Sequence, residues 1–393
     1  MRFKGRREMS KVLLFAVVVA AGSAAAVEYQ PKDETELKAC LPKLRVGDVI
    51  SLVPGKTYFT GMVIRRSGTV EKPIVVKGNG AILDGLAPIP DDSWVDKGKG
   101  LFLSPNKYCH GANFPRVCDR DGNLMKVVDK NVHRVKPETL KPGEANWDKQ
   151  GAWYRVKAGE KSPVGLGLTG YYGDCGIDIC NQSYITVENL TTQHFANDGF
   201  NVHGQSQGLV FRNICGRHCG DDGFSVHEDV QAVVYGGHFH HCDDGIQDIQ
   251  ASQTTFFGCL VESNRLWGVG FSGGYRGMFD STIRDNGGDQ LWVGSSHLEK
   301  PYKFAKEVPL IRGSAYFKNL KVGEGRGLAL RVDPGAEVSC DNCRFYRTAR
   351  GVEVRKGAAL HLSRCRFDDV AQPKFTVAEG ATLVADGEKK SGH

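Results

Sequence analysis

The chain has 393 residues and a formal net charge of +6, with 51 lysines and arginines against 45 aspartates and glutamates. Five of the basic residues and one acidic residue fall in the first 26, so the rest carries 46 minus 44, or +2. This balance excludes the strongly basic class of nucleic-acid-binding proteins, and the length allows one long repetitive domain or two ordinary ones.

Residues 1–26 have the three parts of a secretory signal peptide. A basic start is followed by an apolar stretch at residues 12–21 and by small residues at 24–26, where we expect cleavage near Ala26. A stretch of about ten apolar residues is too short to span a bilayer, and no later segment approaches that length. The sequence therefore predicts a secreted or periplasmic protein without a membrane span.

Residues 27–85 predict an N-terminal cap and the first coils of a repetitive β fold. A helix-like stretch at 34–41 is suited to cover an open end. Short alternating strands follow at 46–53, 68–76 and 81–85, separated by Gly and Pro turns.

Residues 86–172 lack the repeat and predict an inserted subdomain rich in short apolar β-strands. Cys109 and Cys118 close a short loop in this insert and are a candidate disulfide in an oxidising compartment. At the other end of the chain, residues 387–393 are expected to form a polar tail.

The segment 173–386 repeats with a period in the low twenties, which predicts stacked β-coils with equivalent residues in columns about 4.8 Å apart. The steps between apolar positions are 22–24 residues, apart from one step of 37 that requires a loop of about 14 extra residues near 296–311. Such loops often border a binding groove. The nine positions are Ile177, Phe200, Phe224, Ile246, Val269, Leu291, Leu328, Val352 and Phe375.

The first strands carry a family resemblance. Gly47-Asp-Val-Ile-Ser-Leu, Gly55-Lys-Thr-Tyr and Gly68-Thr-Val-Glu-Lys-Pro-Ile resemble the start of right-handed parallel β-helix proteins of the pectate-lyase-like superfamily. In the insert, Asp121-Gly-Asn-Leu and Leu140-Lys-Pro-Gly are similar to the insert of some bacterial β-helix glycosidases. The resemblance implies an all-β, right-handed, single-stranded parallel β-helix that acts as a monomer on a polysaccharide, as a lyase, an epimerase or a glycosidase.

One column of the repeat is acidic. Asp198, Asp222 and Asp244 precede the same glycine in three successive coils, and Trp267 and Asp289 continue the column. Carboxylates about 5 Å apart repel by about 3 kcal/mol at an effective dielectric constant near 20, so such a column holds protons, binds a cation or pairs with bases. The alternative is that each Asp-Gly is a turn whose carboxylate caps local backbone N–H groups.

A second polar column lies directly before the first and consists of Asn197, Asp221 and Asp243. Asn197-Asp198 and Asp221-Asp222 resemble the Asn-Thr-Asp and Asp-Asp motifs of polygalacturonase-type glycosidases. The Gly-His-Gly and Arg-x-Lys motifs of that family are absent, so the resemblance does not extend to polygalacturonase activity itself.

The leading functional hypothesis is a glycoside hydrolase that requires no cofactor. Retaining glycosidases hold two carboxyl groups about 5–5.5 Å apart, and inverting ones about 6.5–9.5 Å. Asp222 with Asp244 on neighbouring coils fits the first range, whereas Asp198 with Asp244 reaches the second. The candidate catalytic residues are Asp198, Asp221, Asp222, Asp243, Asp244 and, as a candidate base, His227.

A third column faces outward if Phe200 and Val202 point inward. Its amide, imidazole and indole groups resemble a sugar-binding wall, although an ordinary solvated sheet face has the same pattern. The predicted substrate-binding residues are Asn201, His203, Gln247, Trp267, Arg276 and Trp292.

Two other functions remain open. A polysaccharide lyase or epimerase acting on a uronic-acid polymer could use the acidic column to bind Ca²⁺, with Arg265, Arg276 and Arg284 on neighbouring coils. A non-catalytic carbohydrate-binding or surface protein would use the same aspartates only as turn residues.

Asp248 breaks the alternation, because it occupies the inward position of Val202 and Val226. Either a bulge turns Asp248 outward, which we favour, or the carboxyl is buried with a raised pKa as a candidate proton donor.

No metal site other than Ca²⁺ is predicted. His238, His240 and His241 lie close together in sequence, but adjacent strand residues point to opposite faces. Cys340-x-x-Cys343 lacks the second ligand pair of a zinc site. Cys343 and Cys365 open two Cys-Arg-Phe repeats 22 residues apart, which predicts a disulfide between adjacent coils; a ladder of free thiols is the alternative.

Overall fold

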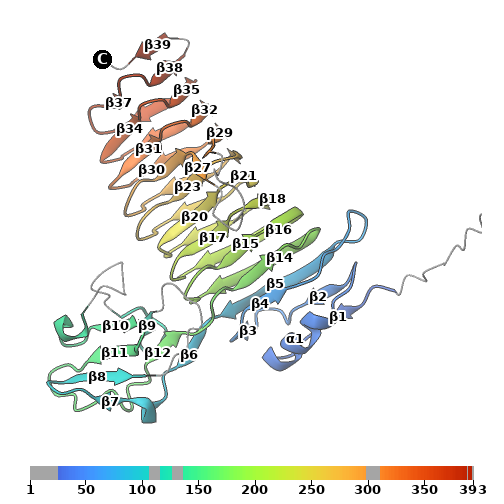
Figure 1. The fold of residues 1–393 in the computed structure, drawn as a ribbon, viewed down its shortest axis with the longest axis vertical. Helices are drawn as coiled ribbons and strands as arrows, with labels where there is room; N and C mark the ends of the chain where they lie inside the picture. Colours follow the sequence, from blue (N-terminus) through green and yellow to red (C-terminus); the bar gives the residue numbers. More distant parts are fainter. Residues whose placement is uncertain (1–24, 106–115, 126–135, 298–309, 387, 392–393) are drawn as a thin grey trace, which may run out of the picture.

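The chain folds as a stack of β-coils, and Figure 1 shows the coils rising from the N-terminal end to the C-terminus. The computed structural model describes residues 25–105, 116–125, 136–297, 310–386 and 388–391. The fold class predicted from the period is confirmed, because one face of the stack is a parallel sheet of ten short strands. These are β4 (Met62–Ile64), β13 (Ile177–Cys180), β15 (Phe200–His203), β17 (Asp222–Val226), β20 (Asp244–Ile249), β23 (Val269–Ser272), β26 (Leu291–Gly294), β31 (Leu328–Val332), β34 (Arg350–Val354) and β37 (Phe375–Val377).

The other two faces of the stack form one twenty-stranded sheet, in which three long strands bend through both faces. The long strands are β5 (Ile74–Asp84), β14 (Ile185–Gln193) and β16 (Gln205–Arg217). The first face adds β1 (Glu28–Tyr29), β2 (Val49–Ser51), β18 (Asp229–Tyr235), β21 (Gln253–Phe257), β24 (Tyr275–Phe279), β29 (Ser314–Lys318), β32 (Glu337–Asp341), β35 (Ala359–Ser363), β38 (Thr382–Ala385) and the antiparallel β39 (Glu388–Ser391). The second adds β3 (Thr57–Tyr58), β19 (His238–His240), β22 (Leu260–Glu262), β25 (Thr282–Arg284), β30 (Lys321–Gly323), β33 (Arg344–Tyr346) and β36 (Arg366–Asp368).

A column of residues with left-handed backbone conformation makes the corner between these two faces. Asn189 has φ of 53° and Asn213 of 49°, and the Asn213 side-chain amide donates to Oδ1 of Asn189 at 3.3 Å. Asn319 and Asn342 repeat the arrangement on later coils. Asn tolerates positive φ because its short polar side chain bonds locally, so these residues fix the angle at which each coil turns.

The predicted apolar column fills the interior of the stack. The six members from Ile177 to Leu291 pair in register and are fully buried. The next member is Leu330, which pairs with Val352, so the prediction of Leu328 is wrong. The step is 330 minus 291, or 39, and two more residues than expected belong to the long connection, which contains the hairpin of β27 (Ser296–His297) and β28 (Leu310–Ile311).

Two residues expected on the outside lie in the interior. Asp248 pairs in register with Val226 and is 0% exposed, so the favoured bulge is wrong. Its Oδ1 accepts hydrogen bonds from Arg276 Nη2 at 2.7 Å and from the Ser252 hydroxyl. Arg276 is also 0% exposed and cannot contact a polysaccharide, which overturns its predicted substrate-binding role. A buried charge without its partner is costly, so each of the two depends on the other.

The insert between β5 and β13 has its own small core. Two antiparallel sheets enclose buried residues that include Trp147 and Tyr154. Figure 1 shows this insert beside the lower coils. Its elements are β6 (Leu86–Pro88), the 3-10 turn η2 (Asp91–Ser93), β7 (Val95–Asp96), β8 (Leu101–Ser104), β9 (Val117–Cys118), η4 (Pro137–Thr139), β10 (Ala145–Asp148), β11 (Gly151–Arg155) and β12 (Thr169–Tyr171).

A short helix lies at the N-terminal end of the stack, as the sequence predicts. It is α1 (Glu34–Cys40), followed by the 3-10 turn η1 (Leu41–Lys43), and the Asp33 carboxylate caps it by accepting from the Glu36 N–H at 2.9 Å. Within the described residues, no helix has the length and apolar character needed to cross a membrane. The predicted signal peptide, up to residue 24, lies outside the described residues, as do residues 387 and 392–393 of the predicted polar tail. The rest of that tail forms β39, which pairs with β38.

Free thiols stand where the disulfide between Cys343 and Cys365 was predicted. Cys343 is buried and Cys365 half-buried, and both are free, so the structure has the thiol ladder in place of the disulfide. Sγ of Cys365 lies 3.5 Å from the Cys340 carbonyl oxygen, as expected of a stacked thiol. Cys118 is also a free, buried thiol, while Cys109 lies outside the described residues.

Candidate active site

The acidic column is in register, and most of its carboxylates bond the backbone of the next coil. Asp198 Oδ1 accepts from the Asp222 N–H at 3.1 Å, and Asp244 Oδ1 accepts from the Trp267 N–H at 2.8 Å. Asp289 Oδ1 accepts from the Leu328 N–H at 2.9 Å. These three carboxylates therefore hold successive coils together. This role is close to the alternative in which each Asp carboxylate only caps backbone N–H groups.

Asp222 is the exception in this column. The Asp244 N–H, which would be its partner, donates instead to the Asp221 carbonyl at 3.2 Å. Asp222 Oδ1 is buried and has no hydrogen-bond partner among the residues that the structure describes. Burial, then the charges of Asp221 and Asp198, raises the pKa of Asp222 well above its ordinary value, so the surroundings favour its protonated form.

The expected open pair of Asp222 and Asp244 is not observed. The two residues pair in register on neighbouring coils, but only 2% of Asp222 and 5% of Asp244 is exposed. Burial raises the pKa of Asp244 to about 7. Both side chains therefore lie beneath the surface and are not open to a substrate.

The second polar column is the one that reaches the surface. The N–H of Asn197 donates to the Asp174 carbonyl at 2.9 Å, that of Asp221 to Asn197 at 3.0 Å, and that of Asp243 to Asp221 at 2.9 Å. Asp174 is exposed, and Asn197 and Asp221 are half-buried. Sequence reasoning missed Asp174, although it stands two residues before the repeat glycine, as Asn197 and Asp221 do.

Asp243 belongs to a buried ion-pair network that joins the insert to the coils. Its Oδ2 lies 3.0 Å from Nη2 of Arg116, which comes from the insert, and its Oδ1 lies 2.5 Å from Nε of Arg265. The Asp243 side chain is 4% exposed and that of Arg116 is 1% exposed. Asp243 is therefore a paired, structural carboxylate.

Asp221 is half-buried beside this network. Burial, then the charge of Asp243, raises its pKa to about 6, although Arg116 and Arg265 act in the opposite direction. A carboxyl that is reachable and titrates near pH 6 is suited to proton transfer. The pKa of Asp174 is also raised, by burial and by Asp178.

The same groups offer a set of oxygen ligands. One carboxylate oxygen each from Asp198, Asp221 and Asp222 lies within 4.8 Å of the others. Side-chain Oδ1 of Asn197 and of Asn201 is buried without a hydrogen-bond partner among the described residues. A set of three carboxylates fits Ca²⁺, which Asp198, Asp221 and Asp222 would hold.

The outward row predicted from the alternation is present along the ten-stranded sheet. Register aligns Asp178, Asn201, Ser225, Gln247, Gly270, Trp292 and Arg331 on successive strands. Gln247 and Asn201 are half-buried, as is Trp292. These groups form a shallow polar and aromatic strip that runs across the coils.

Two tryptophans form the aromatic part of this strip. The rings of Trp267 and Trp292 lie 5.5 Å apart, edge to face, and the Arg331 guanidinium lies 5.3 Å from the Trp292 ring. Gly270 leaves room for the indole, because a Cβ there would lie 2.5 Å from Trp292 Nε1. Arg331 also pairs with Asp289 at 2.6 Å, which fixes the cation over the aromatic face.

His227 does not join the aspartates. It follows the last residue of β17, whereas Asp222 is the first, so about 16 Å of extended strand separates the two. His227 stacks on His203 at 5.0 Å, and Nε2 of His203 lies 3.1 Å from Asp178 Oδ1. The Asp178 carboxylate raises the pKa of His203. The expected juxtaposition of His227 with Asp222 and Asp244 is thus wrong.

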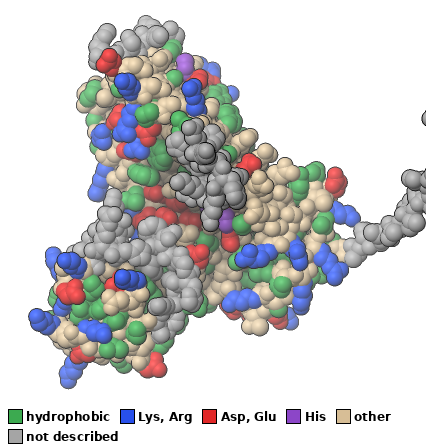
Figure 2. All heavy atoms as spheres, viewed as in Figure 1, with side chains coloured by type: hydrophobic (Ala, Val, Ile, Leu, Met, Phe, Trp, Pro, Cys, Tyr) green, Lys and Arg blue, Asp and Glu red, His purple; other side chains and the backbone are tan. Residues whose placement is uncertain are grey.

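Figure 2 shows acidic side chains gathered over the middle coils, in the hollow beside the insert. A cleft of about 560 Å³ lies between the two parts, with residues 121–124 on the insert side. On the coil side it is lined by Gln193, His194, Arg217, His218, His241, Ser263 and Arg265. Arg265 thus connects the acidic columns to this cleft.

Comparison with known proteins supports the architecture. A family model described as "Right handed beta helix region" matches residues 175–300. No curated protein matches the sequence. The structure is similar to "Crystal structure of pectate lyase Pel9A", with TM-score 0.54, 14% identity, and coverage of 92% of this chain and 80% of that one.

A second similar structure is "The complex structure of XylC with xylose", with TM-score 0.52, 10% identity and coverage of 83% of this chain. The chain spans 65% of the length of that protein. At these identities the similarity establishes the right-handed parallel β-helix and leaves the reaction to the chemistry of the site.

Proposed function

We propose that this protein is a polysaccharide-active enzyme, a glycoside hydrolase with Asp221 as general acid. The observation that carries the proposal is the half-buried Asp221 carboxyl, whose pKa burial raises to about 6, in one column with the exposed Asp174. The two stand two coils apart, about 9.6 Å between equivalent backbone atoms. Inverting glycosidases separate their carboxyl groups by about 6.5–9.5 Å, and this spacing suits that class.

In this mechanism Asp221 donates its proton to the glycosidic oxygen as the bond to the anomeric carbon breaks. The Asp174 carboxylate accepts a proton from the water that attacks the opposite face of the sugar ring. Asn197 lies between them in the column, and its amide donates to Oδ2 of Asp198 at 3.1 Å.

The charges favour a neutral polysaccharide for this reaction. The two arginines that act on Asp221, Arg116 and Arg265, are both committed to Asp243. Without a cation, a uronic-acid polymer would therefore meet unpaired carboxyls. Trp267 and Trp292 provide stacking surfaces for sugar rings at the C-terminal side of the acid.

A second candidate function is supported by the carboxylate oxygens of Asp198, Asp221 and Asp222. With Ca²⁺ on these oxygens, the site could neutralise the carboxylate of a uronic acid, and the protein would be a lyase or an epimerase. The two candidates differ in metal requirement and product.

The deciding experiment is a panel of neutral and uronic-acid polysaccharides, with and without a chelator, assayed for reducing ends and for unsaturated products. The hydrolase proposal expects reducing ends from a neutral polymer, chelator-resistant activity, and a rate that falls as pH rises through about 6, because Asp221 loses its proton. Chelator-sensitive formation of unsaturated ends from a uronate polymer would favour the lyase.

Asp221→Asn tests the assigned acid and should lower kcat by about 10²–10⁴-fold. The matched control is Asp368→Asn, which removes a carboxylate that pairs with Arg344 on the C-terminal coils. Equal losses in both variants, with folding intact, would remove Asp221 from the mechanism. Binding of a polysaccharide without any turnover would favour the non-catalytic alternative.

A further inference from the structure

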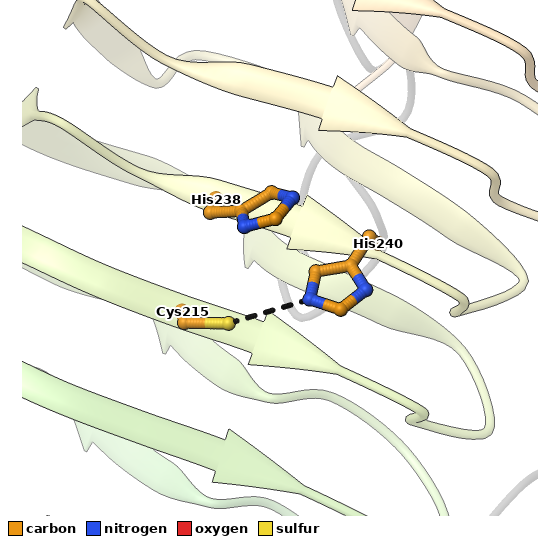
Figure 3. Close-up of side chains that lie close together, drawn as sticks. All are labelled: Cys215, His238 and His240. Atoms are coloured by element: carbon orange, nitrogen blue, oxygen red, sulfur yellow. Dashed lines mark hydrogen bonds between the residues drawn. The ribbon is translucent and has the colours of Figure 1, made fainter.

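A cysteine and two histidines converge on a different sheet from the acidic columns. Cys215 on β16 pairs in register with His238 on β19, and His240 follows two residues later. Two residues apart on a strand, His238 and His240 face the same side, unlike the adjacent His240 and His241. Figure 3 shows all three side chains on the outer surface of the coils. One ligand atom from each lies within 4.8 Å of the others, and all three residues are half-buried.

We propose that Cys215, His238 and His240 form a binding site for Zn²⁺. Sγ of Cys215 lies 3.7 Å from Nε2 of His240. Tetrahedral zinc, with Zn–S of about 2.3 Å and Zn–N of about 2.0 Å, separates sulfur and nitrogen by about 3.6 Å. A thiolate with two imidazoles suits zinc and excludes Ca²⁺ and Mg²⁺, which require oxygen ligands.

Both histidines are held by their other nitrogen, as metal-binding histidines usually are. Nε2 of His238 lies 3.0 Å from Glu262 Oε1, which leaves Nδ1 for the metal. Glu262 is itself held by Arg284 at 2.7 Å. Nδ1 of His240 lies 2.7 Å from Nδ1 of His241, which leaves Nε2 facing Cys215.

The corner of the coil explains how His241 reaches His240. His241 has φ of 59°, so the chain turns there and brings the two rings together at 4.9 Å. The ligands come from two consecutive coils, so bound zinc would join β16 to β19. Three protein ligands leave a fourth tetrahedral position for water.

The test is titration of the metal-free, full-length protein with Zn²⁺ by calorimetry, and with Co²⁺ by absorption spectroscopy. We expect a thiolate-to-cobalt band and visible bands of tetrahedral intensity. Cys215→Ser should abolish the thiolate band, and His238→Gln should weaken zinc binding by at least about 100-fold. His238 is 39% exposed, so this variant should fold. Glu262→Gln should weaken binding by about tenfold, which a purely structural role would not produce.

The matched controls lie elsewhere on the same sheet. His361→Gln alters a histidine that is 45% exposed and lies 4.0 Å from Glu337, and Cys365→Ser removes another half-buried thiol. Both should bind zinc as the unaltered protein does. The proposal is overturned if zinc does not bind, if Cys215→Ser keeps the thiolate band, or if His227→Gln abolishes binding while His238→Gln does not.

Discussion

The middle coils and the C-terminal coils have the same strand geometry but differ in whether their stacked carboxylates are paired with arginines. On the C-terminal coils, Arg355 pairs with Asp333 at 2.9 Å and with Glu353 at 2.6 Å, so carboxylates alternate with guanidinium groups. On the middle coils, Asp222 is flanked by Asp198 and Asp244 in successive coils. Among the described residues, the C-terminal coils therefore stack without such a column of carboxyls, whereas the middle coils keep one at a cost in repulsion.

Burying and stacking carboxyls costs free energy, which hydrogen bonds and ion pairs offset. Asp198 and Asp244 offset part of this cost by accepting backbone hydrogen bonds from the next coil. Asp243 offsets more of it, because it forms ion pairs with Arg116 and Arg265. The pKa values of Asp198, Asp221, Asp222 and Asp244 are all raised by burial. Among these four, Asp221 is half-buried and the others are buried, so function is sought at Asp221.

The largest effect on stability is expected when a substitution breaks the ion-pair network of the middle coils. Arg116→Met leaves Asp243 buried with Arg265 alone and should lower the free energy of unfolding by about 3 kcal/mol. Arg355→Met on the C-terminal coils, where the guanidinium is 44% exposed, should cost less than about 1 kcal/mol. Urea unfolding of the two variants measures both, and equal losses would contradict the contrast between the regions.

A smaller effect is expected at the aromatic strip. Trp292→Ala removes a stacking surface and should raise KM for the polysaccharide by about tenfold, or about 1.4 kcal/mol, with kcat changed by less than about twofold. Tyr346→Ala is the control, since Tyr346 also lies under arginines but on the second face of the C-terminal coils. A KM unchanged in Trp292→Ala would remove the strip from substrate binding.

The stability of the middle coils should depend on pH in a defined direction. The pKa of Asp221 is raised by folding, so its contribution to stability is present at low pH and is lost as pH rises through about 6. Asp221→Asn should therefore stabilise the protein by about 1 kcal/mol at pH 8, a value discounted for partial exposure, and by nothing below pH 4. Thermal unfolding across this range measures the difference, and Asp333→Asn, whose carboxylate is paired, should not gain stability at pH 8. A pH-independent gain at Asp221 would contradict the burial argument.

The smallest effect concerns the cysteines of the C-terminal coils. Because Cys343 and Cys365 are free thiols, dithiothreitol should leave the free energy of unfolding unchanged, whereas loss of a disulfide costs about 2–4 kcal/mol. Thiol titration of the unfolded protein with the Cys343→Ser variant as reference provides a second measurement. If neither thiol reacts with the reagent until the protein is reduced, the free-thiol assignment is wrong and the two cysteines form a disulfide.

The coil register was predictable where the period is regular, and it failed at the long connection. A step of 22–24 residues identifies Phe200 and Phe224 as neighbours, because each coil has the same three turns. Between Leu291 and Leu330 the chain leaves the stack, and sequence alone does not say where it rejoins. The two-residue error follows from that loss of periodicity.

The site was predicted in composition but not in detail. Asp174 could have been found, since it occupies the position of Asn197 and Asp221 in the repeat. Arg116 could not, because it reaches Asp243 from the insert, 127 residues away. The special position of Asp222 depends on where one backbone N–H points, which no pattern of residue types encodes. The Asp248–Arg276 pair is likewise a contact between two sheets.

The insert departs from the stack and returns to it at nearly the same point. The Tyr172 N–H donates to the Gly85 carbonyl at 2.7 Å, and β5 pairs directly with β14 across the excursion. Coil stacking therefore continues as though residues 86–171 were absent. A cassette joined in this way can be lengthened or exchanged without reregistering any strand, provided that an arginine remains beside Asp243 in the place of Arg116.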